Sequence, residues 1–180
     1  MIEKIQYKCD SILQYGMQLY KSKIVKSNKK IFISTLNIKY GISLPNSKRE
    51  KGNIPLLASN GIIDYVSCAN AENPIVFGCR GTLGNVFYQE GSSFVLNTAF
   101  YINNPKNYGN LFFALKYNNG LILYSSGAAQ PQITIDSIKN ASIKIPNDNV
   151  LNMLLDLYSL YQKQLSKMKE IKTLLLKKYF

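Results

Sequence analysis

The sequence predicts an α+β protein, in which an irregular, mainly β domain lies between a shorter N-terminal helix and a long C-terminal coiled-coil-type helix. Three observations support this fold class. Apolar residues recur at helical spacing near the N-terminus, and short apolar runs alternate with Gly, Asn and Pro in the middle of the chain. Helical spacing then returns after Pro146, with no further Gly or Pro. We therefore expect three parts, namely residues 1–30, 31–146 and 147–180.

The N-terminal helix is expected to run from Ile2 to about Lys23. Its apolar residues are three or four positions apart, which is the pattern of an amphipathic helix, and Gly16 interrupts them: Ile2, Ile5, Cys9, Ile12, Leu13, Met17 and Tyr20. The Lys- and Asn-rich residues 26–30 that follow are expected to form a linker or a solvated turn.

The middle part is expected to consist of short strands with few helices, as in an irregular β domain of roughly 115 residues. Two short helices are expected at Leu111–Tyr117 and Asp136–Asn140, the second of them capped by Asp136. The expected strands are Ile54–Ala58, Ile75–Phe77, Asn85–Tyr88, Phe94–Asn97, Phe100–Ile102, Gln132–Ile135 and Ile143–Ile145.

The spacing of apolar residues in the last part predicts a helix of about 32 residues, which starts at Asn147 or Asp148 and runs almost to Phe180. At 1.5 Å per residue it is about 48 Å long, which is more than its own domain can cover. Its apolar residues follow a heptad-like pattern typical of paired helices. These residues, named here the C-terminal stripe, are expected to form a homodimer or partner interface: Leu151, Leu154, Tyr158, Tyr161, Leu165, Met168, Ile171 and Leu175. Packing on its own domain is the alternative, and a monomer would leave the helix of residues 1–30 or another subunit as the partner.

The composition limits the chemistry that the chain can perform. It has no histidine and ten carboxylates, which excludes Ser-His-Asp and Cys-His devices and removes the commonest metal ligand. The scattered acids form no nuclease pattern. Three cysteines without a CxxC pair argue against a disulfide framework and favour the cytoplasm, and no long apolar run or signal-peptide pattern points to a membrane. We therefore expect no enzymatic activity, no cofactor and no metal.

The charge points to a negatively charged partner. Twenty-two Lys and Arg residues against ten Asp and Glu give a net charge of +12, which is typical of proteins that bind nucleic acid or an anionic membrane surface. No single part of the chain holds the basic excess, so a general compositional bias toward Lys, Asn and Ile is the alternative explanation.

Both arginines of the chain, Arg49 and Arg80, lie in loops that contain glycine. Gly78, Gly81 and Gly84 surround Arg80, and glycines at this density let the backbone approach a partner closely and offer amides to phosphate oxygens. The planar arginine side chain suits bidentate contact with guanine or phosphate. The structural alternative for Arg80 is a bond to a loop carbonyl or to an acid such as Glu90.

Six segments occur in an order that resembles the DNA-specificity subunits of type I restriction-modification systems. They are GISLP, KREKGNIPLLASNGI, IVFGCRGTLGNV, FVLNTAFYI, SSGAAQPQIT and IKIP, and a long helix follows them. Residues 38–180 look like one target-recognition domain with its conserved spacer helix. Family members usually carry two of each in one chain, so this chain looks like a half-subunit, and residues 1–30 do not match the start of such a domain.

The resemblance implies a non-catalytic protein that binds one half of a bipartite double-stranded DNA target. It would dock the methyltransferase subunit and, through it, the restriction subunit. Gln130 and Gln132 would bind adenine, with a loop-bracing role as the alternative. The other loop residues expected to contact phosphates and base edges are Lys48, Arg49, Lys51, Asn60, Tyr65, Arg80 and Thr82. The alternative function is a partner-binding adaptor or modulatory half-subunit that does not read DNA.

Overall fold

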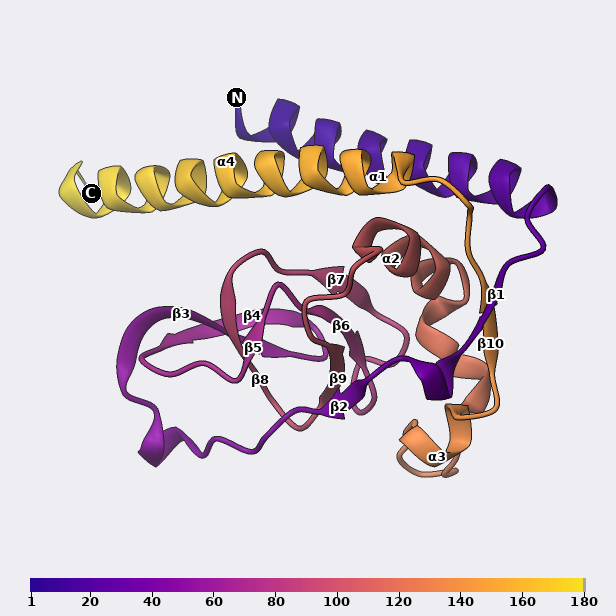
Figure 1. Ribbon diagram of the computed structural model, residues 1–180. Helices are drawn as coiled ribbons and strands as arrows, with labels where there is room; N and C mark the ends of the chain where they lie inside the picture. Colours follow the sequence, from indigo (N-terminus) through magenta and orange to yellow (C-terminus); the bar gives the residue numbers. More distant parts are fainter. Residues whose placement is uncertain (180) are drawn as a thin grey trace.

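Two long helices lie side by side above a β-rich domain in the computed structural model, which describes residues 1–179 (Figure 1). Helix α1 (Ile2–Val25) and helix α4 (Val150–Tyr179) run in opposite directions and pack against each other. A shorter helix, α2 (Tyr108–Tyr117), lies beneath both of them and also contacts the sheet strand β7 (Val86–Tyr88). This arrangement confirms the predicted α+β class.

The β domain contains two four-stranded sheets. In the first sheet all neighbours are antiparallel, and the strand order is β2 (Ile38–Tyr40), β9 (Ala99–Ile102), β6 (Ile75–Gly78) and β7. In the second sheet only β3 and β8 are parallel, and the order is β4 (Gly61–Val66), β3 (Lys51–Ala58), β8 (Ser92–Val95) and β5 (Ala71–Glu72). Within the described residues, short 3-10 turns complete the domain at Ile33–Thr35, Asn46–Lys48 and Asn119–Tyr124.

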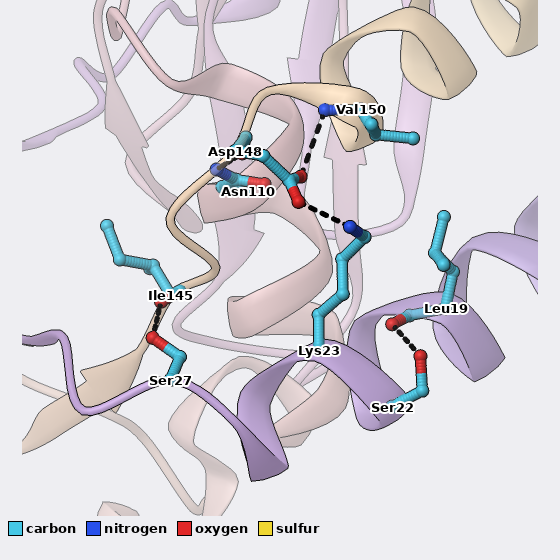
Figure 2. Close-up of polar contacts among 8 residues, drawn as sticks. All are labelled: Leu19, Ser22, Lys23, Ser27, Asn110, Ile145, Asp148 and Val150. Atoms are coloured by element: carbon cyan, nitrogen blue, oxygen red, sulfur yellow. Dashed lines mark hydrogen bonds and ion pairs between the residues drawn. The ribbon is translucent and has the colours of Figure 1, made fainter.

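A two-stranded ribbon closes the domain at the point where the chain enters and leaves it. Strand β1 (Lys30–Phe32) pairs antiparallel with β10 (Ser142–Lys144), so the end of α1 and the start of α4 lie close together. Figure 2 shows the polar contacts at this junction, where Lys23 forms an ion pair with Asp148 and Ser27 Oγ donates a hydrogen bond to the carbonyl oxygen of Ile145 at 2.6 Å. The end of α1 and the start of α4 are thus held together by the backbone hydrogen bonds of the β1–β10 ribbon, by an ion pair and by a side-chain hydrogen bond.

The main core lies between the first sheet and the helices. Aromatic side chains fill it, and Phe77, Phe100, Phe112 and Phe113 are all completely or almost completely buried. Phe112 and Phe113 come from α2, whose residues 109–115 are buried on every side. Helix α2 is therefore the layer that joins the sheet to the α1–α4 pair.

Several predicted elements need correction. Gln132–Ile135 is not a strand: Gln132 forms an isolated bridge with Ser126, and helix α3 (Ile135–Ile138) begins at its last residue. The cap of α3 is Thr134 rather than Asp136, because the Thr134 hydroxyl accepts a hydrogen bond from the backbone N–H of Ser137 at 3.1 Å. Residues 26–30 are not entirely a linker, since Lys30 begins β1. Strands β1, β2, β4 and β5 were not predicted. The other six strands, both long helices and α2 are present within one to three residues of the expected bounds.

Candidate nucleic-acid interface

Three turns from distant parts of the chain meet at one end of the β domain. The turn after β3 is bound to the Gly-rich segment 78–85, because Asn85 Nδ2 donates to the carbonyl oxygen of Ser59 at 3.1 Å and the backbone N–H of Thr82 donates to Ser59 Oγ at 3.4 Å. The backbone N–H of Ser59 in turn donates to Thr98 Oγ1 at 3.2 Å. These bonds bring Asn60, Arg80 and Thr82 to the same end of the domain.

The segment that carries the two candidate glutamines joins this end. The backbone N–H of Ile133 donates to the carbonyl oxygen of Cys79 at 2.9 Å, so the 125–132 loop lies beside the Gly-rich segment. Gln130 is exposed, whereas Gln132 is half-buried and its backbone is paired with Ser126. We name Asn60, Arg80, Thr82, Gln130 and Gln132 the loop-end group.

Glycine is required where the Gly-rich segment turns. Gly84 has φ +74°, and a Cβ at this position would lie 2.4 Å from the carbonyl oxygen of Asn119. The 78–85 segment is therefore packed tightly against the Asn119–Tyr124 turn. This contact holds the end of the segment that follows Arg80.

Arg80 has an exposed side chain with no hydrogen bond or ion pair to any residue in the range 1–179. The alternative of a structural pair with Glu90 is wrong, because Glu90 binds Lys163 at 2.8 Å. The backbone N–H of Arg80, by contrast, donates to the carbonyl oxygen of Thr98 at 3.1 Å. The backbone is fixed while the guanidinium group remains available.

The remaining candidate residues lie elsewhere on the second sheet. Lys48, Arg49 and Lys51 precede or begin β3, while Asn60 follows its end, so eight strand residues or roughly 26 Å separate the two groups. Arg49 is half-buried and its Nε donates to the carbonyl oxygen of Leu44 at 3.1 Å, which makes it a loop brace. Tyr65 lies between the groups on β4, 46% exposed. The nine predicted residues therefore do not form one cluster.

The chemistry of the loop end is that of binding. Burial raises the pKa of the Cys79 thiol to about 11, despite the opposing effect of Arg80, so this thiol stays protonated at neutral pH. Within residues 1–179, no group of three Cys, Asp or Glu side chains is placed to hold a metal ion. The loop-end group provides one guanidinium group, three side-chain amides and one hydroxyl.

A groove that the sequence analysis missed runs between α4 and the β domain, where it is lined by residues of both four-stranded sheets. Its volume is about 1260 Å³; residues 158–169 of α4 form one wall, and residues of the β3–β4 hairpin and of the 85–92 segment form the other. We name it the α4 groove. Lys163 and Lys167 line it, and their spacing of four residues places them on one face of the helix, which is the signal that could have identified them.

The C-terminal stripe has a partner within the chain over most of its length. Leu151 and Leu165 are 0% and 3% exposed, and the Lys8 ammonium of α1 lies 5.1 Å from the ring centroid of Tyr161. Leu154, Tyr158, Tyr161 and Met168 are half-buried, and Leu155 and Ser159 are buried although they were not part of the prediction.

The stripe is uncovered at its far end. Helix α4 continues past the N-terminus of α1 (Figure 1), and there Ile171 and Leu175 are 49% and 51% exposed. None of the helices in the described residues combines the length and the apolar character that a membrane span needs.

Comparison with known proteins identifies the family. The type I restriction modification DNA specificity domain matches residues 19–168. The chain belongs to this family. The resemblance that the six sequence segments indicated is thereby confirmed. Comparison with curated protein sequences gave no significant match.

Several solved structures share the fold of this chain. The chain is similar to the S subunit of a type I restriction-modification system from M. genitalium, with 18% identity and a TM-score of 0.69 over 99% of this chain and 57% of the other. It also resembles a chain from a structure on complex assembly and conformational transition of the type I R-M system, with 12% identity and a TM-score of 0.56 over 96% and 50%. A third match is the HsdS subunit from Thermoanaerobacter tengcongensis, with 12% identity and a TM-score of 0.53 over 94% and 49%. The chain spans about half the length of these structures.

Proposed function

We propose that this chain corresponds to half of a type I restriction-modification specificity subunit and recognises one half of a bipartite DNA target. The observation that carries the proposal is the Arg80 guanidinium, which is exposed on a backbone held by hydrogen bonds to Thr98, in a segment whose Gly84 packs closely against Asn119. A donor fork on a rigid loop suits base-edge recognition, because the loop needs no further ordering when DNA binds. Asn60 and Gln130, at the same end of the domain, add amide donors and acceptors.

We propose that a second copy of the chain binds the other half of the DNA target. The exposed end of α4 presents Ile171 and Leu175, together with Leu174, Leu176 and Tyr179, so that an antiparallel pairing of two such ends would cover them. Two recognition domains would then read inverted half-sites. The dimer is proposed to act in the cytoplasm and to dock the methyltransferase subunit, and through it the restriction subunit, without catalysis of its own.

Selection from a pool of random duplexes tests DNA recognition. The purified chain is expected to enrich a defined sequence, to bind it at least about 10³-fold more tightly than unrelated duplex, and to lose affinity steeply as salt is added. Enrichment of no sequence, with intact binding to a methyltransferase subunit, would instead support the adaptor function.

A further inference from the structure

The α4 groove leads away from the loop-end group. Asn60, which belongs to that group, also lines the groove, and Tyr65 and Asn53 continue the same wall along the β3–β4 hairpin. The opposite wall is the middle of α4, with Lys163 and Lys167. A molecule bound at the loop end can therefore extend along the groove without a break in the surface.

The charges of the groove favour an anion. Lys163, Lys167 and Lys169 line it, whereas Glu90 is the one acid among the lining residues that the structure describes. Glu90 pairs with Lys163 across the groove at 2.8 Å, with side chains that are 46% and 56% exposed. Lys167 is exposed and has no ion pair within residues 1–179. The groove thus holds positive charge that no carboxylate neutralises.

The size and lining of the groove favour a polymer over a small molecule. Sites for small ligands usually have volumes of about 300–1,000 Å³ and mainly apolar walls. The α4 groove has about 1260 Å³, and twelve of its 21 lining residues are Asn, Gln, Ser or Lys. Amides, hydroxyls and ammonium groups in such a row are the donors that bind consecutive phosphates.

We propose that the α4 groove binds the sugar–phosphate backbone of duplex DNA beside the recognised half-site, with Lys163 and Lys167 as phosphate contacts. This inference rests on the proposed function and assigns a DNA-contacting role to the long helix itself. A DNA phosphate replaces the Glu90 carboxylate as the partner of Lys163, so the ion pair seen in the free protein holds Lys163 in place and opposes binding at the same time. Substitutions on the two sides of the pair therefore have effects of opposite sign.

Affinity for a labelled duplex of unrelated sequence, measured over a range of salt concentrations, tests the proposal. Lys167→Gln is expected to reduce the slope of log affinity against log salt by about 0.9, which corresponds to one phosphate contact. Lys172→Gln, on the same helix but outside the groove lining, is the matched control and is expected to leave the slope unchanged. Both lysines are exposed, so neither change is expected to affect folding.

Removal of the acid gives the opposite result. Glu90→Gln is expected to strengthen binding by about threefold, because it frees Lys163 and removes a negative charge from the groove. The matched control is Glu170→Gln on α4, outside the lining, which changes the net charge equally and is expected to have a much smaller effect.

Two outcomes overturn the proposal in distinguishable ways. Equal slopes for Lys167→Gln, Lys172→Gln and wild type, with sequence-selective binding intact, would remove the groove from the DNA interface and leave the proposed function standing. No binding of the wild type to any duplex, selected or unrelated, would overturn both.

Discussion

Gly16 of α1 lies against the ring of Phe113 in α2 so closely that a Cβ atom on residue 16 would come within 2.2 Å of Cζ of the phenylalanine. Phe113 is 0% exposed and packs edge-on against Phe112, with ring centroids 5.0 Å apart. The ring therefore has no free space into which it can turn. The glycine that interrupts the apolar pattern of the sequence is the point at which α1 approaches the core.

Gly16→Ala is expected to destabilise the protein. Overpacking of a filled core costs about 1–3 kcal/mol, which exceeds the roughly 1 kcal/mol that alanine adds through its better helix propensity. Urea unfolding would measure the loss as a lower midpoint. Replacing the facing ring by a smaller side chain provides the control. The double change Gly16→Ala with Phe113→Leu is expected to lower the free energy of unfolding by less than the sum of the two single changes. Strict additivity would contradict this contact.

The charge on Asp148 is expected to contribute to stability in a pH-dependent way. The hydrogen bond from Lys23 holds the pKa of this carboxyl below its ordinary value of 3.8, so its contribution is present above that pH and is lost as the pH falls through the lower folded value. Asp148→Asn keeps an acceptor for the backbone N–H of Val150 and removes only the charge. Because the side chain is 47% exposed, the expected loss is below about 1 kcal/mol.

Urea midpoints at about pH 6 and about pH 2 would test this contribution. The difference between wild type and Asp148→Asn is expected at the higher pH and is expected to shrink at the lower one. Asp136→Asn is the control, because its pair with Lys139 is 3.4 Å long and the Asp136 side chain is 90% exposed. A difference that persists at low pH would show that the charge is not the cause.

Elements with a strong local signal were predictable from the sequence, and those that depend on distant pairing were not. The apolar runs of β3 and β6 and the helical spacing of α4 gave their elements directly. Strand β4 gave no signal, because its residues 62–65 are all exposed and therefore do not alternate. The run Gln132–Ile135 looked like a strand, but the Thr134 cap starts a helix there.

The site divides in the same way. Glycines around Arg80 identified its loop, since turn chemistry is local. The separation of Arg49 from Arg80, and the position of Lys163 and Lys167 across a groove from Tyr65, depend on sheet pairing and on how α4 crosses the domain. No local spacing in the sequence encodes those distances.

The two arginines are expected to differ when each is replaced. Arg80→Ala is expected to relax preference at one base position by about 1–3 kcal/mol, because the exposed guanidinium is free to bind a base edge. Arg80→Lys keeps the charge and is expected to lose the same preference, since lysine lacks the planar fork. Binding to the selected duplex and its single-base variants would measure this; a uniform loss over all sequences would indicate a phosphate contact instead.

Arg49→Ala is expected to leave base preference unchanged. Its Nε binds the carbonyl oxygen of Leu44, so its loss is expected to lower the free energy of unfolding by about 1 kcal/mol. A changed base preference in Arg49→Ala, with unfolding unaltered, would place this arginine in the DNA interface after all.

The exposed end of α4 is expected to hold two copies together. Ile171→Glu with Leu175→Glu is expected to give monomers without changing the unfolding of the chain, because both side chains are about half exposed in the single copy. Leu165→Glu is the contrast: this side chain is 3% exposed, so a charge there is expected to destabilise the α1–α4 packing by about 3 kcal/mol or more. Sedimentation at micromolar concentration separates the two effects.

The same pairing predicts how the half-sites are arranged in the DNA target. Two copies joined antiparallel through α4 would place their recognition domains at opposite ends, so the selected sequence is expected to contain two inverted copies of one half-site. Each α4 has 30 residues, and two copies that overlap only at residues 171–179 span about 76 Å, which limits the separation of the half-sites to about 22 base pairs at 3.4 Å each. The Ile171→Glu, Leu175→Glu protein is expected to retain binding to a single half-site and to lose the gain from the second. A wild type that is monomeric at micromolar concentration and selects a single, non-repeated half-site would contradict the dimer and leave the methyltransferase subunit as the partner of this end of α4.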